Sequence, residues 1–169
     1  MKIRPATAED FDAIWPIFEQ VVSAGDTYAY PTDMTKQEAF HVWMEQPRQT
    51  YVCELGHDIA GSYYLKTNAA GPGSHVCNAG FMTGETYRGR GIASAMCQHA
   101  QVEAVAMGYL AMQFNFVAST NEGAVRLWQQ QGFDTVGRLP RAFMHPALGL
   151  VDALVMFKWL SQDDQSIGA

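Results

Sequence analysis

The sequence predicts a single α/β domain built from about six to seven strands and about four helices. The chain has 169 residues, of which 48% are hydrophobic, and this is enough for one core. Segments with the two-residue period of strands alternate along the chain with segments that have the helical period of three to four residues. There is no internal repeat and no long linker. We therefore expect residues 1–169 to form one domain, with a frayed polar end at 161–169.

The first part of the chain predicts one strand followed by two helices. A short strand at residues 2–4 precedes Thr7, which can cap a helix. The apolar positions of that helix are Phe11, Ile14, Phe18 and Val21. Pro16 falls inside it and removes a backbone donor, so we expect a kink or an early break there. After a loop at 25–35, a second helix is expected at 36–45.

The middle of the chain predicts three strands and the longest helix. Runs at 50–55 and 59–66 flank Gly56-His57-Asp58, which indicates a hairpin. A third strand at 75–83 leads into a run of Arg and Gly. The helix that follows stops at Gly108. Its apolar stripe consists of Ile92, Met96, Ala100, Ala104 and Met107.

The last part of the chain predicts a strand, a helix and two more strands. The strand at 110–117 places Asn115 on one face and Leu110, Met112, Phe114 and Phe116 on the other. The helix at 121–131 has Ala124, Leu127 and Trp128 on its inner side and Gly132 as its stop. The final strands are expected at 133–137 and 152–159.

Composition and charge exclude several classes of function. A net charge of −6 and an isoelectric point near 5.2 argue against a nucleic-acid partner, because phosphate contacts need clustered Lys and Arg. No run of about 18 apolar residues and no signal core is present, so we expect a cytoplasmic protein without a membrane partner. The Cys and His residues lack metal-ligand spacing, which predicts free thiols and no metal. They are Cys53, Cys77, Cys97, His41, His57, His75, His99 and His145.

The most informative segment is the Arg- and Gly-rich run at 87–93, between a predicted strand and a predicted helix. This arrangement presents free backbone N–H groups and the positive end of a helix to an anion, so it predicts a diphosphate site. The pattern Gly89-x-Gly91-x-x-Ser94 could also be an altered dinucleotide-binding fingerprint. Against this, the next strand ends without a ribose-binding acid, and the motif does not follow the first strand.

Two motifs together resemble the GNAT superfamily of acetyl-CoA-dependent N-acetyltransferases. They are Arg88-x-x-Gly91-x-Ala93 and Asn121-x-x-Ala124-x-x-Leu127-Trp128-x-x-x-Gly132-Phe133. The order of predicted elements over the whole chain is also similar to that family's single-domain fold. The resemblance implies a mixed, strongly twisted sheet, with acetyl-CoA as acyl donor and no metal.

In that family the loop amides bind the coenzyme A diphosphate, and the preceding strand pairs with the pantetheine arm. The resemblance gives these roles to Arg88, Gly89, Arg90, Gly91, Ile92 and Ala93, and to the backbone of Met82, Thr83 and Gly84. It also implies that Asn121 and Trp128 approach the thioester, and that a bulge near Gly80 opens the acyl channel. Trp128 replaces the Tyr that protonates the thiolate in many members; an indole donates a hydrogen bond but no proton. Trp128 could equally be a core residue.

The asparagines resemble the substrate site of fungal N-acetyltransferases that act on proline analogues such as azetidine-2-carboxylate. Asn78, Phe81, Asn115 and Asn121 fall in the same relative places. The resemblance implies that the amides of the three Asn hold a small amino acid's carboxylate and polarise the reacting groups, while Phe81 lines the apolar side. Each Asn could instead be structural, and Asn121 also fits a helix cap. Asn78 and Phe81 would share a face only with the bulge at Gly80.

The predicted activity is direct transfer of acetyl from acetyl-CoA to the amine of a small molecule, such as an amino acid or proline analogue. Backbone N–H groups near Met82 and Thr83 would stabilise the oxyanion. Tyr28 and Tyr30, in the loop at 25–35, could wall the acceptor pocket or simply pack there.

Several alternatives stay open from the sequence. Other acceptors are a phosphinothricin-like amino acid, a polyamine, an aminoglycoside or a peptide N-terminus. Alternatives from other classes are a noncatalytic acetyl-CoA-binding module and a nucleotide-dependent oxidoreductase. His145 or Asp152 could act as a base through water. The apolar strand around 153–157 could contact a second copy in a homodimer or lie inside the sheet.

Overall fold

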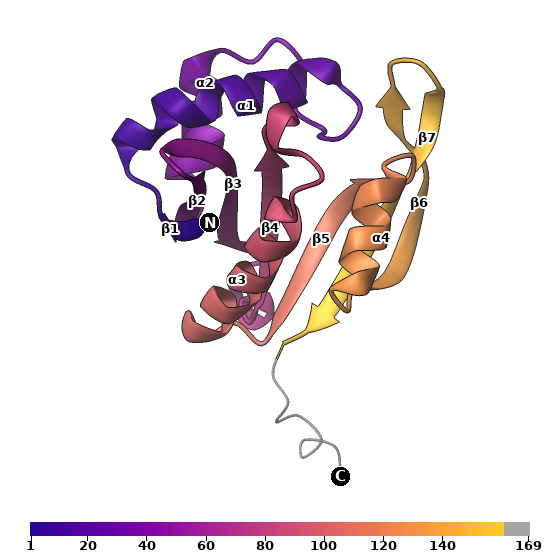
Figure 1. The fold of residues 1–169 in the computed structure, drawn as a ribbon. Coiled ribbons are helices and arrows are strands. Elements are labelled where there is room, and N and C mark those ends of the chain that lie inside the picture. Colours follow the sequence, from indigo (N-terminus) through magenta and orange to yellow (C-terminus); the bar gives the residue numbers. More distant parts are fainter. Residues whose placement is uncertain (161–169) are drawn as a thin grey trace.

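The computed structural model describes residues 1–160 and shows one mixed sheet of seven strands (Figure 1). The strands follow the order β1-β2-β3-β4-β5-β7-β6 across the sheet. Their bounds are β1 Lys2–Pro5, β2 Gln49–Leu55, β3 Asp58–Thr67, β4 Val76–Thr83, β5 Ala111–Ala118, β6 Asp134–His145 and β7 Gly149–Trp159. All neighbours are antiparallel except β4 and β5, which are parallel. The predicted fold class is confirmed; the expected fraying at 161–169 lies outside the described residues.

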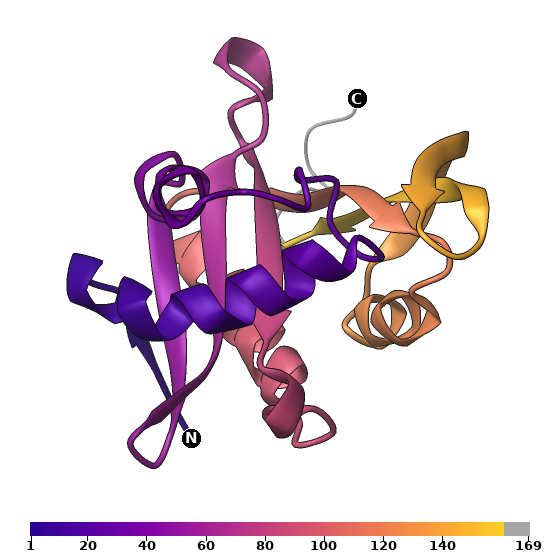
Figure 2. The same cartoon turned by 90° about the horizontal axis from the view of Figure 1, so that it is seen from above.

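Within residues 1–160, four α-helices cover the two faces of the sheet, as the sequence predicts. They are α1 Phe11–Ala24, α2 Lys36–Phe40, α3 Ile92–Ala106 and α4 Glu122–Gln130. A π-helical turn, His41–Glu45, continues α2 through the predicted range. α1 and α2 pack on one face around the fully buried Phe18 and Trp43, while α3 and α4 pack on the other face. Figure 2 shows α1 crossing the β2–β4 half of the sheet and α4 beside the β5–β7 half.

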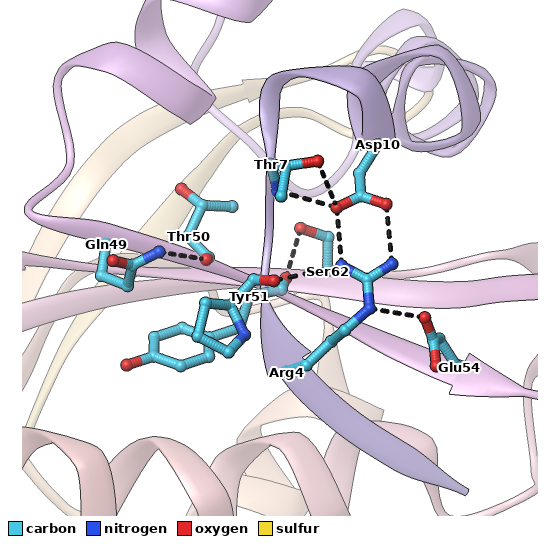
Figure 3. A network of polar contacts seen from close by, with 9 residues as sticks. Arg4, Thr7, Asp10, Gln49, Thr50, Tyr51, Glu54 and Ser62 are labelled. Carbon is cyan, nitrogen blue, oxygen red and sulfur yellow. Dashed lines mark hydrogen bonds and ion pairs between the residues drawn. The ribbon is translucent and has the colours of Figure 1, made fainter.

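A charged network ties β1 to the start of α1 (Figure 3). The Arg4 guanidinium donates to both carboxylate oxygens of Asp10, at 2.7 and 2.8 Å, and to Glu54 Oε1 at 2.6 Å. The hydrogen bonds from Arg4 are the main reason that the pKa of Asp10 falls to about 2. Asp10 also accepts from the Thr7 N–H at 2.7 Å, within a capping box. The predicted cap at Thr7 is thus confirmed, although it starts a 3-10 turn that leads into α1.

Helix α1 continues through Pro16, so the early break expected there is wrong. Pro16 is exposed, and water can therefore bond the carbonyl that loses its helical partner. The buried positions of α1 are Phe11, Ile14, Ile17, Phe18 and Val22. Val22 takes the buried place that the sequence pattern assigned to Val21.

The sheet forks between β4 and β5. Their pairing is limited to residues 76–78 of β4 and 111–113 of β5, although both strands continue beyond it. β4 stays in constant register with β3 from Cys77 to Thr83. β5, in contrast, shifts register against β7 between Phe114 and Val117. We call the region between the diverging, unpaired parts of β4 and β5 the fork.

The bulge predicted at Gly80 is not present, because β4 and β3 remain in register at that point. Gly80 instead makes room for an aromatic ring: a Cβ there would lie 2.6 Å from Tyr64 Cε1. Alternation along β4 is therefore unbroken, and Asn78 and Phe81 lie on opposite faces. The cooperation of these two side chains that the sequence suggested is not supported by the fold.

The last two strands are longer than predicted. β6 extends to His145 instead of ending at residue 137, and β7 begins at Gly149 instead of 152. β6 is a mostly exposed edge strand with two register shifts, so it tolerates Pro140 and lacks a clear alternating pattern. β7 lies between β5 and β6, which places 153–157 inside the sheet. Leu110, predicted to lie within this strand on the same face as Met112 and Phe114, precedes β5 and is 40% exposed.

Candidate functional site

A glycine-containing loop leads from β4 into α3. Gly89 and Gly91 have φ angles of 73° and 75°, which glycine adopts without strain. A Cβ at either position would meet no atom within 4 Å, so this backbone borders open space. The first helical bond runs from Ala95 N to Gly91 O at 3.0 Å, which leaves the N–H groups of residues 92–94 without helical acceptors. Free amides at a helix N-terminus suit a diphosphate.

Two arginines add positive charge to this loop. Arg88 and Arg90 are both exposed, and the Arg90 guanidinium lies 5.7 Å from the centre of the Tyr87 ring. Neither forms an ion pair with a carboxylate of residues 1–160. Both charges therefore remain available for phosphate oxygens.

The edge of β4 in the fork carries unpaired backbone groups. Gly84 N donates to Ala60 O at 2.9 Å, and because bonded pairs alternate along an antiparallel ladder, the even-numbered residues of β4 pair with β3. Odd-numbered residues face β5, as the 3.3 Å bond from Ala111 N to His75 O shows. Beyond the last β4–β5 pair, the N–H groups that point into the fork are those of Phe81 and Thr83.

The alternation of hydrogen bonds along β4 corrects the role expected for Met82. Met82 pairs with Ser62 of β3, so its N–H points away from the fork. Its side chain is 3% exposed and belongs to the core beneath α1. The N–H groups of Phe81 and Thr83, and not that of Met82, are placed to stabilise an oxyanion in the fork.

Tyr28 reaches the fork from the loop between α1 and α2. Its hydroxyl donates to the Phe81 carbonyl at 2.8 Å. Tyr28 stacks on Tyr30, with ring centres 5.7 Å apart and planes 3° apart. Burial raises the pKa of both tyrosines, so both hydroxyls stay protonated at neutral pH. Only Tyr28 bonds the edge of β4, which gives the two predicted wall residues different roles.

Aromatic side chains line the face of the fork toward α3 and α4, opposite the face that Tyr28 reaches. The Trp128 ring lies 5.1 Å from the ring of Phe81 and 5.0 Å from that of Phe114. Trp128 is 9% exposed and belongs to the core cluster of α3 and α4. Trp128 is therefore a core residue whose ring also contacts Phe81 beside the fork, and its approach to the thioester stays a prediction.

Asn78 stands where the fork begins and is 6% exposed. Its Nδ2 donates to Gln113 O of β5 at 3.0 Å, and its Oδ1 accepts from the Tyr64 hydroxyl at 3.1 Å. Asn115 is exposed, accepts from Gln113 Nε2 at 2.9 Å and donates to Asn68 Oδ1 at 2.7 Å. Gln113 thus connects the two predicted asparagines. Sequence reasoning missed Gln113, Asn68 and Tyr64, because their partners come from other strands.

Asn121 caps α4, as expected. Its Oδ1 accepts from Ala124 N at 3.3 Å, which leaves both amide protons free for another partner. Among residues 1–160, two buried hydroxyls have no hydrogen-bond partner, those of Thr27 and Thr120. Thr27 precedes Tyr28, and Thr120 precedes Asn121. An unpaired buried hydroxyl costs about 1–3 kcal/mol, so a polar ligand or water at either position would stabilise the structure.

The two candidate bases already have partners. His145 Nδ1 accepts from Ala147 N and Leu148 N, each at 3.2 Å, and so holds the turn after β6. The Asp152 carboxylate accepts from Arg141 N at 2.9 Å and from Arg138 Nη1 at 2.7 Å. These bonds lower the pKa of Asp152, which makes it a weaker base. Neither residue is well placed to remove a proton.

Other features of the described chain limit the kinds of site present. Within residues 1–160 there is no cluster of three or more His, Cys, Asp or Glu that could hold a metal, and no helix could span a membrane. The three cysteines are free and buried, as predicted. Burial raises the pKa of Cys97 to about 11 and that of Cys77 to about 12, so neither is a reactive thiolate.

The fold and the site define a class of protein: an α/β fold whose sheet forks beside a helix N-terminus with free amides. The chain belongs to the acetyltransferase (GNAT) family, whose model matches residues 9–133. It is therefore an enzyme of the N-acetyltransferase type, as the sequence predicts.

Individual relatives agree with this assignment. A GCN5-related N-acetyltransferase from Kribbella flavida is 41% identical, with a TM-score of 0.88 over 94% of this chain and 96% of that one. The putative acetyltransferase yncA from Salmonella typhimurium, solved with its cofactor acetyl-CoA, has the same fold at 19% identity, with a TM-score of 0.81 over 96% of this chain and 95% of that one. The N-acetyltransferase aca1 of Schizosaccharomyces pombe is 33% identical over 79 residues, which are 47% of this chain and only 38% of that relative.

Proposed function

We propose that the protein transfers acetyl from acetyl-CoA to the amine of a small molecule by direct attack. The observation that carries this proposal is the fork itself. The N–H groups of Phe81 and Thr83 point into it, and the free amides of α3 lie at the end of the loop that follows β4. A thioester arm and a diphosphate can therefore bind to neighbouring segments of one continuous stretch of chain.

The donor would be held by three groups of residues. The amides of 88–93, with the charges of Arg88 and Arg90, bind the diphosphate. The backbone of Phe81 and Thr83 pairs with the pantetheine arm in place of the missing β5 partner. Gly84, which the sequence also suggested, does not, because its N–H donates to Ala60 O and its carbonyl accepts from Tyr87 N, each at 2.9 Å. An amide proton of Asn121 remains for the same arm on the β5 side. The acetyl-CoA bound to the relative yncA supports this choice of donor.

The chemistry then needs few groups from the protein. Bound acetyl-CoA supplies a thioester carbonyl that a neutral amine can attack. The N–H of Phe81 or Thr83 donates to the developing oxyanion. The amine loses its proton to water, since His145 and Asp152 are engaged elsewhere. Trp128 can only donate a hydrogen bond, and a thiol with a pKa of about 8.5 leaves tolerably as an anion.

The favoured acceptor is a small amino acid or a proline analogue. The polar wall of Asn78, Gln113 and Asn115 and the partial likeness to aca1 support this choice. Phe81, on the other face, would line the apolar side of the donor arm and not the acceptor.

Two further expectations from the sequence remain predictions. They are a cytoplasmic location and the homodimer considered there.

The test is release of coenzyme A thiol from acetyl-CoA across an amine library. The library contains amino acids, azetidine-2-carboxylate, phosphinothricin, polyamines, aminoglycosides and peptides. Acetylation of amino acids at the highest kcat/KM is the expected result. Binding of acetyl-CoA without thiol release in any mixture would contradict the proposal and favour a noncatalytic binding module.

A further inference from the structure

An unusual backbone conformation occurs in the middle of β6. This strand leaves its register with β7 between Leu139 and Phe143. Arg141, inside this bulge, has a φ angle of 54° and is the one non-glycine residue with positive φ in residues 1–160. Such a conformation is strained for a residue with a Cβ, and it tends to occur at functional sites.

The carboxylate of Asp152 holds this conformation in place. One oxygen accepts from the Arg141 backbone N–H at 2.9 Å, and the other accepts from Arg138 Nη1 at 2.7 Å. Both oxygens are therefore used without the Arg141 side chain. That side chain is exposed and forms no ion pair with a carboxylate of residues 1–160. A fixed backbone thus presents an unpaired guanidinium.

The bulge that carries Arg141 lies near the open end of the fork. Asp152 O accepts from Ser119 N at 2.9 Å, which ties the bulge to the end of β5, two residues before Asn121. The unpaired hydroxyl of Thr120 lies in the same short connection. Figure 1 shows the β6–β7 hairpin beyond the upper end of β5, and both views place it across the fork from the loop between α1 and α2.

The bulge alone does not require an arginine. Bulges blunt edge strands against unwanted pairing, but glycine or asparagine would adopt positive φ at lower cost. A planar guanidinium, in contrast, matches a carboxylate with two parallel hydrogen bonds. The cost of placing Arg141 here is explained if its side chain binds an anionic group at the mouth of the fork.

We propose that Arg141 binds the carboxylate of the acceptor, so that the enzyme selects amines that carry a free carboxylate. This inference rests on the proposed acetyl transfer and specifies its acceptor class. Asp152 and Arg138 act as positioning residues, because they fix the backbone of Arg141 without touching the acceptor. The polar groups of Asn78 and Asn115 then contact other parts of the acceptor.

The experiment compares each amino acid with its own primary amide, which differs in the carboxylate alone. Arg141→Gly removes the guanidinium and accepts the positive φ, and Arg141→Asn is a second variant that tolerates the same conformation. For the acid, kcat/KM should fall about 10- to 100-fold in both variants, as expected for a lost charge-assisted pair. For the amide, kcat/KM should stay within about twofold of the wild-type value.

The matched control is Arg126→Gln, which removes another exposed arginine, one that pairs with Glu122 on α4. Arg126→Gln should leave kcat/KM unchanged for both the acid and the amide. An equal loss for acid and amide in the Arg141 variants, or no loss for either, would overturn the assignment of Arg141 and leave acetyl transfer intact. Turnover of the amides but not of the acids by the wild-type enzyme would also overturn the assignment of Arg141. If the wild-type enzyme releases no thiol with any amine, acetyl transfer and the role of Arg141 both fail.

Discussion

β4 and β5 start as paired neighbours, but only β4 keeps a regular ladder to its end. β4 stays in register with β3 over its whole length, while β5 shifts against β7 between Phe114 and Val117. The fork therefore opens because β5 departs, and β4 presents its edge on a regular scaffold. This division suits an enzyme of this family: regular backbone groups on β4 can bind a constant donor, whereas the β5 side, with the β6 bulge, can vary with the acceptor.

The largest expected effect lies on the donor side. Gly91→Asp places a negative charge at the proposed diphosphate site, and the affinity for acetyl-CoA should fall at least about 100-fold, which corresponds to about 3 kcal/mol. Gly56→Asp is the matched control, because Gly56 also has positive φ and open space around its Cβ. Calorimetry should show normal affinity for the control. Equal affinities in the two variants would remove 88–93 from the donor site.

On the β5 side, Asn121 combines a cap with a free amide. Asn121→Ala should lower the free energy of unfolding by about 1 kcal/mol, and it should lower kcat/KM about tenfold through the lost amide. Asn121→Ser retains the cap and loses the amide, so it should keep the stability and still show the loss in kcat/KM. Full activity in Asn121→Ser would mean that Asn121 is a cap and nothing more.

A smaller effect is expected where the loop between α1 and α2 meets β4. Tyr28→Phe removes the hydrogen bond to the Phe81 carbonyl, and kcat/KM should fall about three- to tenfold. Tyr30→Phe changes the stacked neighbour in the same loop and leaves that bond in place, so its kcat/KM should stay near the wild-type value. Steady-state kinetics of both variants checks this. Equal losses in the two variants would show that the hydrogen bond from Tyr28 to Phe81 has no special role.

The smallest effect on activity is expected at the network of β1, far from the fork. The pKa of Asp10 is about 2, below its ordinary value of about 3.9. The stabilisation of about 1–2 kcal/mol is complete above pH 4 and is lost as the pH falls toward 2. Asp10→Asn should remove this part of the acid dependence of urea unfolding without changing kcat/KM. A changed kcat/KM in Asp10→Asn would show that the functional site reaches beyond β4 and β5.

The sequence was informative where a signal is local. The order of helices and strands, the glycine loop and the cap at Asn121 follow from residues close together in the chain, and the structure agrees with them. The role of Gly80 was predicted wrongly, because the Tyr64 ring that requires a glycine at this position lies on another strand. The length of β6 was missed because an exposed edge strand with Pro140 has no buried face to impose alternation. The direction of the Met82 N–H depends on strand pairing, which no local pattern encodes.

Amide hydrogen exchange in NMR, with and without coenzyme A, tests the account most directly. In the free protein, the amides of Phe81 and Thr83 face the fork without a strand partner, while that of Met82 bonds to β3. Coenzyme A should therefore slow exchange at Phe81 and Thr83 and leave the already protected Met82 unchanged relative to the rest of β4. Unchanged exchange at Phe81 and Thr83 in the saturated complex would contradict the claim that this edge of β4 binds the donor.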